Sequence, residues 1–176
     1  MAEEKMLSSE LEFDGQRFRV KIDAVLMPSG RESSREVVEV GNAVTIVPVD
    51  NEGKVLLVRQ YRYPVGKELL ELPAGGIDGD ESPEEAVRRE MQEETGYLPG
   101  RVERLGGFYS APGFCTEYLY LYLAADLKES RLYAEDTEMI QVERYSPGEI
   151  TRLIASGEIE DAKSIVGLLT LLSTLK

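Results

Sequence analysis

Hydrophobic and polar residues alternate near the start of the chain in the manner of half-buried strands. Apolar side chains occupy every second position of residues 18–26, and charged side chains fill most of the positions between them. Asp14-Gly15, just before this segment, has the composition of a hairpin turn. After a polar, frayed start through Ser9, residues 1–40 are therefore expected to form a small antiparallel sheet that ends with a returning strand over Glu36–Val40.

The pattern changes at Gly41 and predicts an α/β domain over residues 41–176. Segments rich in apolar and β-branched residues predict six strands, at Ala43–Val49, Lys54–Tyr61, Glu68–Leu72, Arg104–Tyr109, Tyr118–Ala125 and Met139–Tyr145. The fifth of these is nearly continuous in apolar residues and is expected at the centre of a sheet. Capping residues predict three helices, which follow Ser82, Ser146 and Asp161. The last helix carries an apolar stripe of Ile165, Leu168, Leu169 and Leu172.

Composition excludes several classes of protein. Hydrophobic residues make up 42% of the 176 residues, enough for a core, while a net charge of -13 disfavours binding to nucleic acid. The single Cys115 cannot form an intrachain disulfide, the start is not a signal peptide, and the longest apolar run is too short for a membrane span. These features predict a cytoplasmic protein.

The chain contains no histidine, which limits its acid–base chemistry. A Ser/His/Asp triad is excluded, and a general base must be a carboxylate, a lysine, a tyrosine or a metal-bound hydroxide. An acidic protein of this kind can still bind an anionic substrate if divalent cations lie between the two.

The helix after Ser82 carries the most informative cluster of charges. Glu90 and Glu94 are four residues apart and share one helix face, and Glu93 borders them. Taken alone, such a cluster is typical of a solvated acidic face. The loop at residues 73–76, Pro-Ala-Gly-Gly, precedes the helix and is tight enough to bring backbone groups near a ligand. Strand, glycine turn and carboxylate helix together indicate a binding site.

Gly75, Glu81 and the run Arg89-Glu90-Met91-Gln92-Glu93-Glu94-Thr95-Gly96-Tyr97 have the spacing and the apolar positions of the Nudix box. The chain thus resembles the Nudix hydrolases. The resemblance implies a Nudix-type α/β/α sandwich with a mixed sheet, and Mg²⁺-dependent hydrolysis of a diphosphate, with Mn²⁺ as a possible substitute. Hard cations of this kind prefer carboxylate and carbonyl oxygens, which agrees with the residues present.

The resemblance also assigns roles to residues. It implies that Glu90 and Glu94 bind the metal, that Glu93 joins them or holds bridging waters, and that the Ala74 carbonyl contributes an oxygen. Arg89 would orient the glutamates by ion pairing. Glu81 is left open between an outer metal ligand and a partner at the start of the helix.

Two further segments, 60–75 and 110–117, resemble the ADP-ribose pyrophosphatase subfamily, in which Pro112 marks the position sixteen residues after Gly96. This resemblance implies that Arg62 contacts a phosphate, that Glu71 contacts the terminal ribose, and that Pro112 and Gly113 border the substrate. Without it, Arg62 reads as a surface arginine and Pro112-Gly113 as a turn.

The expected reaction converts ADP-ribose to AMP and ribose 5-phosphate. The alternatives are hydrolysis of GDP-mannose or another nucleoside diphosphate sugar, a non-catalytic nucleotide-binding Nudix module, and a structural domain that binds divalent cations.

In the same subfamily a glutamate on the loop before the strand 139–145 acts as general base. Glu138 fits this position best, with Asp136 and Glu135 behind it. Alternatively, this segment is only an exposed acidic loop, and the general base is Glu93 on the helix. The subfamily also implies a homodimer built through the N-terminal sheet, in which Phe18 is a candidate for stacking on the base.

Overall fold

The computed structural model describes residues 3–134, 137 and 139–174. Contacts divide the chain into two compact units. Unit 1 contains Met1–Asn42 together with Tyr109–Tyr118, and unit 2 contains Ala43–Phe108 and Leu119–Lys176. The segment with Pro112 and Gly113 therefore groups with the N-terminal sheet, although it lies far along the chain from it.

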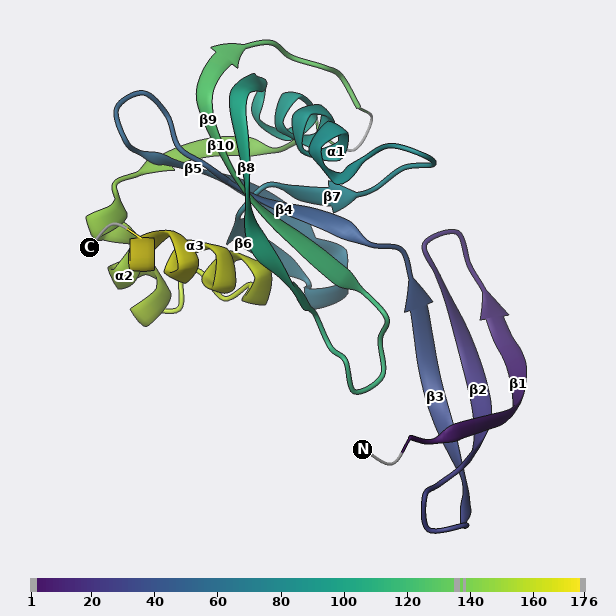
Figure 1. The fold of residues 1–176 in the computed structure, drawn as a ribbon. Coiled ribbons are helices and arrows are strands. Elements are labelled where there is room, and N and C mark those ends of the chain that lie inside the picture. The colour runs from purple at the N-terminus through teal and green to yellow at the C-terminus, as the bar shows by residue number, and fades with distance from the viewer. Residues whose placement is uncertain (1–2, 135–136, 138, 175–176) are drawn as a thin grey trace. The chain divides into compact units, whose positions relative to one another are not determined.

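Unit 1 is a three-stranded antiparallel sheet in the order β1-β2-β3 (Figure 1), as the alternation predicts. Its strands are β1 (Lys5–Asp14), β2 (Phe18–Leu26) and β3 (Glu32–Val40). The expectation of a frayed start through Ser9 was wrong. Every side chain of β1 is exposed, yet its backbone pairs with β2 from Lys5 onward, because the hairpin at Asp14 sets the register.

The segment 109–118 extends the edge of this sheet. The Val38 amide donates to the Phe114 carbonyl at 2.7 Å, and the Thr116 amide donates to the Val38 carbonyl at 3.0 Å. The Thr116 hydroxyl also donates to the Val40 carbonyl and accepts from the Val40 amide, at 3.1 and 3.0 Å. These bonds fix the turn at Pro112 to β3.

Unit 2 contains two sheets, ordered β7-β4-β9-β8 and β10-β5-β6. Their strands are β4 (Ala43–Pro48), β5 (Val55–Arg62), β6 (Lys67–Glu71), β7 (Ala74–Gly76), β8 (Tyr97–Tyr109), β9 (Tyr118–Glu129) and β10 (Gln141–Tyr145). β4 runs parallel to β9 and antiparallel to β7, so the four-stranded sheet is mixed, as predicted. β9 occupies an inner position there, in agreement with its apolar sequence.

The helices of unit 2 cover both faces of β4. They are α1 (Pro83–Glu90), the π-helical turn η2 (Met91–Thr95), α2 (Pro147–Ala155) and α3 (Ala162–Thr174), with a short 3₁₀ turn η1 (Tyr63–Val65) after β5. Val44 and Ile46 pack against α1, while Val47 packs into the core that α2 and α3 cover. Since neighbouring strand residues point to opposite faces, the strands lie between two helical layers (Figure 1). The predicted α/β/α sandwich is confirmed.

The three predicted helix starts are confirmed, but the stripe of α3 was only partly right. Leu168 is buried, and Ile165 and Leu172 are partly buried, whereas Leu169 is half exposed. Gly167 and Leu171 face the core in its place, because a glycine lets the helix approach the Leu72 side chain closely. In the part of the chain that the structure describes, no helix has the length and apolar character needed to cross a membrane.

Candidate functional site

The glutamate helix is fixed at both ends by the residues that the sequence indicated. The Ser82 side chain accepts a hydrogen bond from the Glu85 amide, and the Glu85 carboxylate accepts one from the Ser82 amide, which completes a capping box. At the other end Gly96 adopts φ 79°, a conformation that favours glycine. Between them the last turn widens from α to π geometry, so Glu94 lies in a π turn, a feature common at functional sites.

The glycine loop packs directly against the glutamates. A Cβ atom placed on Gly75 would lie 1.9 Å from Glu90 Oε1, so any larger residue here would displace the Glu90 carboxylate. The Ala74 amide donates to Glu94 Oε2 at 3.0 Å. The loop is held in turn by β4, where Thr45 pairs with Ala74 and the Ile46 amide donates to the Pro73 carbonyl at 2.9 Å. The contact of Ala74 is thus through its N–H, and the role expected for its carbonyl stays a prediction.

Glu90 and Glu94 are both buried, which is rare for carboxylates. Burial raises the pKa of Glu94 to about 8, and the neighbouring charge of Glu90 adds to the effect. The pKa of Glu90 is also raised, again mainly by burial, although its ion pair with Arg89 opposes the shift. The two side chains would hold their charges at lower cost if a cation lay beside them.

Arg89 links the carboxylates that surround the start of the site. It donates to Glu81 Oε1 at 2.6 Å, to Glu90 Oε1 at 2.6 Å and to Glu93 Oε2 at 3.2 Å. A further bond to the Gly76 carbonyl at 2.8 Å ties it to the glycine loop. These are the ion pairs expected of Arg89. They make Glu81 a partner of Arg89 at the start of the helix, and the Arg89 contact lowers the pKa of Glu81.

The carboxylates have the chemistry for a hard divalent cation. Glu94 takes part in no ion pair within the described chain, where its carboxylate accepts one hydrogen bond, from Ala74. As the side chains stand, no three carboxylates of the described residues are gathered closely enough to hold a metal ion, and Arg89 occupies oxygens of both Glu90 and Glu93. A buried carboxylate that lacks a countercharge nevertheless fits an oxygen-binding cation such as Mg²⁺.

A second charged group lies beside this cluster. Arg62 donates from Nε and Nη2 to the two oxygens of Glu71, each at 2.8 Å, and Lys163 at the start of α3 also donates to Glu71. The charges of Arg62 and Lys163 both act on Glu94 and lower its pKa, in opposition to burial. The charges of Arg62 and Lys163 thus reach Glu94, while the contacts expected of Arg62 and Glu71 with the substrate stay predictions.

Lys163 is a residue that sequence analysis missed. One signal was present. A lysine in the first turn of a helix opposes the helix dipole, so Lys163, two residues after the cap Asp161, calls for a compensating anion. Lys163 pairs with Asp161 itself at 2.9 Å and also with Glu71, 92 positions away in sequence, which only the tertiary structure brings beside it.

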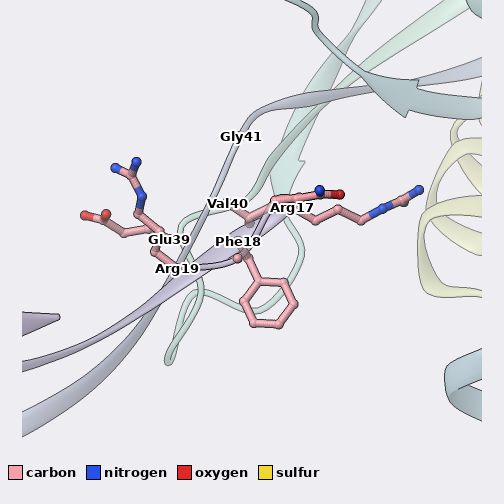
Figure 2. A pocket seen from close by; sticks show the side chains of 8 residues that line it. Arg17, Phe18, Arg19, Glu39, Val40 and Gly41 are labelled. Carbon is pink, nitrogen blue, oxygen red and sulfur yellow. The ribbon is translucent and has the colours of Figure 1, made fainter. Parts of the chain in front are cut away.

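The remaining candidates are placed differently. Pro112 and Gly113 lie in unit 1, on the turn that extends β3. Glu138, Glu135 and Asp136 lie outside the described residues. Phe18 lines a hollow of about 310 Å³ in unit 1 (Figure 2). Its ring also packs against that of Phe13, with the ring centroids 5.6 Å apart.

Comparison with known proteins identifies relatives of the whole chain. A sequence model described as the NUDIX domain matches residues 40–166. An ADP-ribose pyrophosphatase from Bacillus subtilis (strain 168) is 34% identical over 164 residues, which span 92% of this chain and 89% of that protein. A GDP-mannose pyrophosphatase from Yersinia enterocolitica is 39% identical over 142 residues, 75% of this chain and 74% of that protein. The crystal structure of an ADP compounds hydrolase has the same fold, with a TM-score of 0.91, 23% identity and coverage of 98% and 94%.

The raised pKa of Glu94 predicts how pH affects the stability of the metal-free protein. Because the folded pKa, about 8, exceeds the ordinary value of 4.5, the contribution of Glu94 is full below pH 4.5 and is lost as pH rises through 8. Glu94→Gln, which stays neutral, should reduce this loss and raise the melting temperature at pH 9 by at least about 2–4 °C, the effect of 1 kcal/mol in a domain of this size.

Circular dichroism melts in EDTA from pH 6 to pH 9 would measure this difference. Glu84→Gln, an exposed position on the same helix, is the matched control and should follow the wild-type curve. Parallel curves for the wild type and Glu94→Gln would contradict the assignment.

Proposed function

The chain belongs to the NUDIX domain family, and on this basis we propose that it hydrolyses the diphosphate of ADP-ribose in the presence of Mg²⁺, giving AMP and ribose 5-phosphate. Membership of the family, together with relatives named as ADP-ribose and GDP-mannose pyrophosphatases, makes it a pyrophosphatase that acts on nucleoside diphosphate derivatives. ADP-ribose as the preferred substrate, Mg²⁺ as the ion, the homodimer and the residue roles are the parts that we propose.

The observation that carries the proposal is the pair of buried carboxylates behind the glycine loop. Glu90 and Glu94 are buried at adjacent turns of the helix, and Glu94 makes no ion pair within the described chain. Burial of like charges is costly, and a fold retains such a pair when a cation is bound there. A Nudix module that only binds a nucleotide or a protein has no need for this arrangement.

Each residue then has a defined part. Glu90, Glu94 and Glu93 hold the cation, with the Ala74 carbonyl as a further oxygen, and Arg89 orients Glu90 and Glu93. When bound, Mg²⁺ neutralises the diphosphate and activates a water for attack on phosphorus. Mn²⁺ accepts the same oxygen ligands and can substitute for it. Arg62 binds a phosphate oxygen, for which its planar, permanently charged guanidinium is suited.

The proton of the attacking water requires a base. We assign this part to Glu138, with Glu93 on the helix as the alternative. Both are carboxylates, in keeping with a chain without histidine.

The substrate preference rests on resemblance outside the helix. The segments with Arg62, Glu71, Pro112 and Gly113 favour ADP-ribose, and the relative from Bacillus subtilis is named for that activity. The Yersinia enterocolitica relative is named for GDP-mannose and matches at similar identity, so hydrolysis of GDP-mannose is the second candidate. A purely structural cation-binding domain would not account for these segments.

Unit 1 supports the proposal of a homodimer. Among its described hydrophobic residues only Val25 is buried, while Met6, Leu7, Leu11 and Phe13 of β1 and Phe18 and Ile22 of β2 are exposed. A three-stranded sheet without a core is marginally stable unless another surface covers it. A second copy of the chain is the cover that we propose. The cytoplasmic location stays a prediction from the single cysteine.

A panel of nucleoside diphosphate derivatives, incubated with the protein and Mg²⁺, tests the substrate. We expect AMP and ribose 5-phosphate from ADP-ribose, with a higher kcat/KM than for GDP-mannose, when products are identified by chromatography. Glu90→Gln and Glu94→Gln should each lower turnover by orders of magnitude while the fold is retained, and Glu84→Gln should not. A higher kcat/KM for GDP-mannose would favour the second candidate, and near-normal turnover of Glu94→Gln at saturating Mg²⁺ would refute the metal site.

The base is tested by two glutamine variants. If Glu138 accepts the proton, Glu138→Gln should lower kcat by about 100-fold or more, within the range for general bases, with little change in KM. Glu93→Gln should retain more activity and respond to Mg²⁺ concentration. The opposite result, with kcat retained in Glu138→Gln and lost in Glu93→Gln, would move the base to the helix.

The dimer is tested by light scattering at micromolar concentration. We expect a mass near twice the 19.6 kDa of one chain. Ile22→Glu, which adds a charge to the apolar face that Ile22 shares with Phe18, should shift the protein toward monomer, whereas Ser9→Glu, which pairs with Asp23 on the opposite face of the sheet, is the control. A wild-type mass of one chain would count against the dimer.

A further inference from the structure

The first turn of α3 holds the end of β6 through two consecutive contacts. Lys163 donates to the Glu71 carboxylate, and the hydroxyl of the buried Ser164 accepts from the Leu72 amide at 2.7 Å. Asp161 caps this turn by accepting from the Ser164 amide and from Lys163, each at 2.9 Å. Glu71 and Leu72 lie just before the loop that carries Ala74 and Gly75. The C-terminal helix is thereby coupled to the glycine loop.

Glu71 is enclosed by its two cations. Its side chain is 1% exposed, and Arg62 and Lys163 together engage both of its oxygens. A buried carboxylate that loses one of its partners bears a large uncompensated cost, so Glu71 would turn or its surroundings would open. The contact expected between Glu71 and the terminal ribose would require this enclosed side chain to become accessible.

One edge of the Arg62 guanidinium is hydrogen-bonded to Glu71, and the other edge makes no hydrogen bond to the described residues. Nε and Nη2 face Glu71, and Nη1 has no hydrogen-bond partner among the described residues. The side chain is 38% exposed, in contrast to the enclosed Glu71. A guanidinium is planar and rigid, so two bonds to Glu71 also fix the direction of Nη1. Any change in Glu71 therefore changes how Arg62 faces a ligand.

We propose that Lys163 is a positioning residue for substrate binding, which fixes the Glu71 carboxylate so that Arg62 presents Nη1 to a phosphate of the substrate. Lys163 acts through Glu71 and does not itself contact the substrate. The inference rests on the proposed function in one respect, the binding of a phosphate by Arg62. In this proposal Glu71 bridges the side chains of Lys163 and Arg62.

A purely structural role for Lys163 is the alternative to be separated. In that case Lys163 would only anchor α3, and its loss would lower stability without a specific effect on substrate affinity. The chain provides a matched control in Lys67, an exposed residue of β6 that pairs with Glu160 just before α3. Both lysines join β6 to the segment around the start of α3, but only Lys163 contacts Glu71.

The test compares Lys163→Met, Lys163→Arg and Lys67→Met in steady-state hydrolysis of ADP-ribose with Mg²⁺, well below the lowest melting temperature. Lys163→Met should raise KM by about 10-fold, the order expected when a supporting partner is removed, and change kcat less. Lys163→Arg, which keeps the charge, should recover most of the affinity. Lys67→Met should stay within about 2-fold of the wild type, since exposed ion pairs contribute little.

A double-mutant cycle decides whether Lys163 acts through Glu71. If it does, Lys163→Met combined with Glu71→Gln should be no weaker in substrate binding than Glu71→Gln alone. Fully additive losses in KM would overturn the proposal, as would an unchanged KM in Lys163→Met with only a lower melting temperature. If Lys163→Met does not fold, Lys163→Gln, which keeps a donor without the charge, provides the same comparison.

Calorimetric titration of the same variants with ADP-ribose in EDTA separates this inference from the proposed function. A wild type that binds ADP-ribose in EDTA but does not cleave it when excess Mg²⁺ is supplied would refute the proposed reaction, and the order of affinities would still test Lys163. A wild type that cleaves ADP-ribose, together with equal affinities for wild type and Lys163→Met, would refute the inference alone.

Discussion

Two buried carboxylates, Glu90 and Glu94, impose the constraint on which the rest of the site depends. Inside a protein their mutual repulsion and the loss of hydration cannot be relieved by water, as the raised pKa of each side chain shows. The surrounding structure compensates with cations at different distances. Arg89 contacts Glu90 directly, whereas Arg62 and Lys163 act on Glu94 from the side of Glu71. A divalent cation, which we propose to bind here, would provide the charge that Glu94 still lacks.

The scaffold meets this constraint with backbone as well as side chains. Gly75 allows the loop to approach Glu90, and the Ala74 amide donates to Glu94. Both residues belong to β7, whose position is fixed by pairing with β4 between the two helical layers. The helix itself is fixed by a capping box at Ser82 and by Gly96. Placement of the glutamates therefore depends on the packed core, because β4 is buried on both of its faces.

The two compact units do not follow the order of the sequence, because unit 1 combines the N-terminal sheet with a segment from much later in the chain. The segment 109–118 lies between two long strands of unit 2, yet it is bonded to β3 through Val38, Val40 and Thr116. The turn with Pro112 and Gly113 is thereby attached to the sheet that we expect at the dimer contact. The residues that resemble the substrate-selecting motifs are therefore divided between the units, with Pro112 and Gly113 in unit 1 and Arg62 and Glu71 in unit 2.

Local sequence was sufficient wherever one short segment carried the full signal. Asp14-Gly15 determined the first hairpin turn, and the capping boxes determined the helix starts at Ser82 and Ser146. The apolar run of β9 determined its inner position in the sheet. Propensity, capping and alternation act over a few residues, so each of these signals is local. The spacing of Gly75, Arg89, Glu90 and Glu94 likewise identified the Nudix family from the sequence.

Tertiary structure decided what depends on contacts between distant segments. The π turn at Glu94, the exposure of Leu169 and the pairing of β1 from Lys5 have no distinct local signal. The contact of Lys163 with Glu71 joins residues 92 positions apart, and it exists only because α3 packs beside β6. The sequence by itself therefore determined the chemistry of the glutamate helix, since its residues are neighbours along one turn. The residues that alter the pKa values of its glutamates from distant segments are placed there by tertiary packing, which no short sequence pattern encodes.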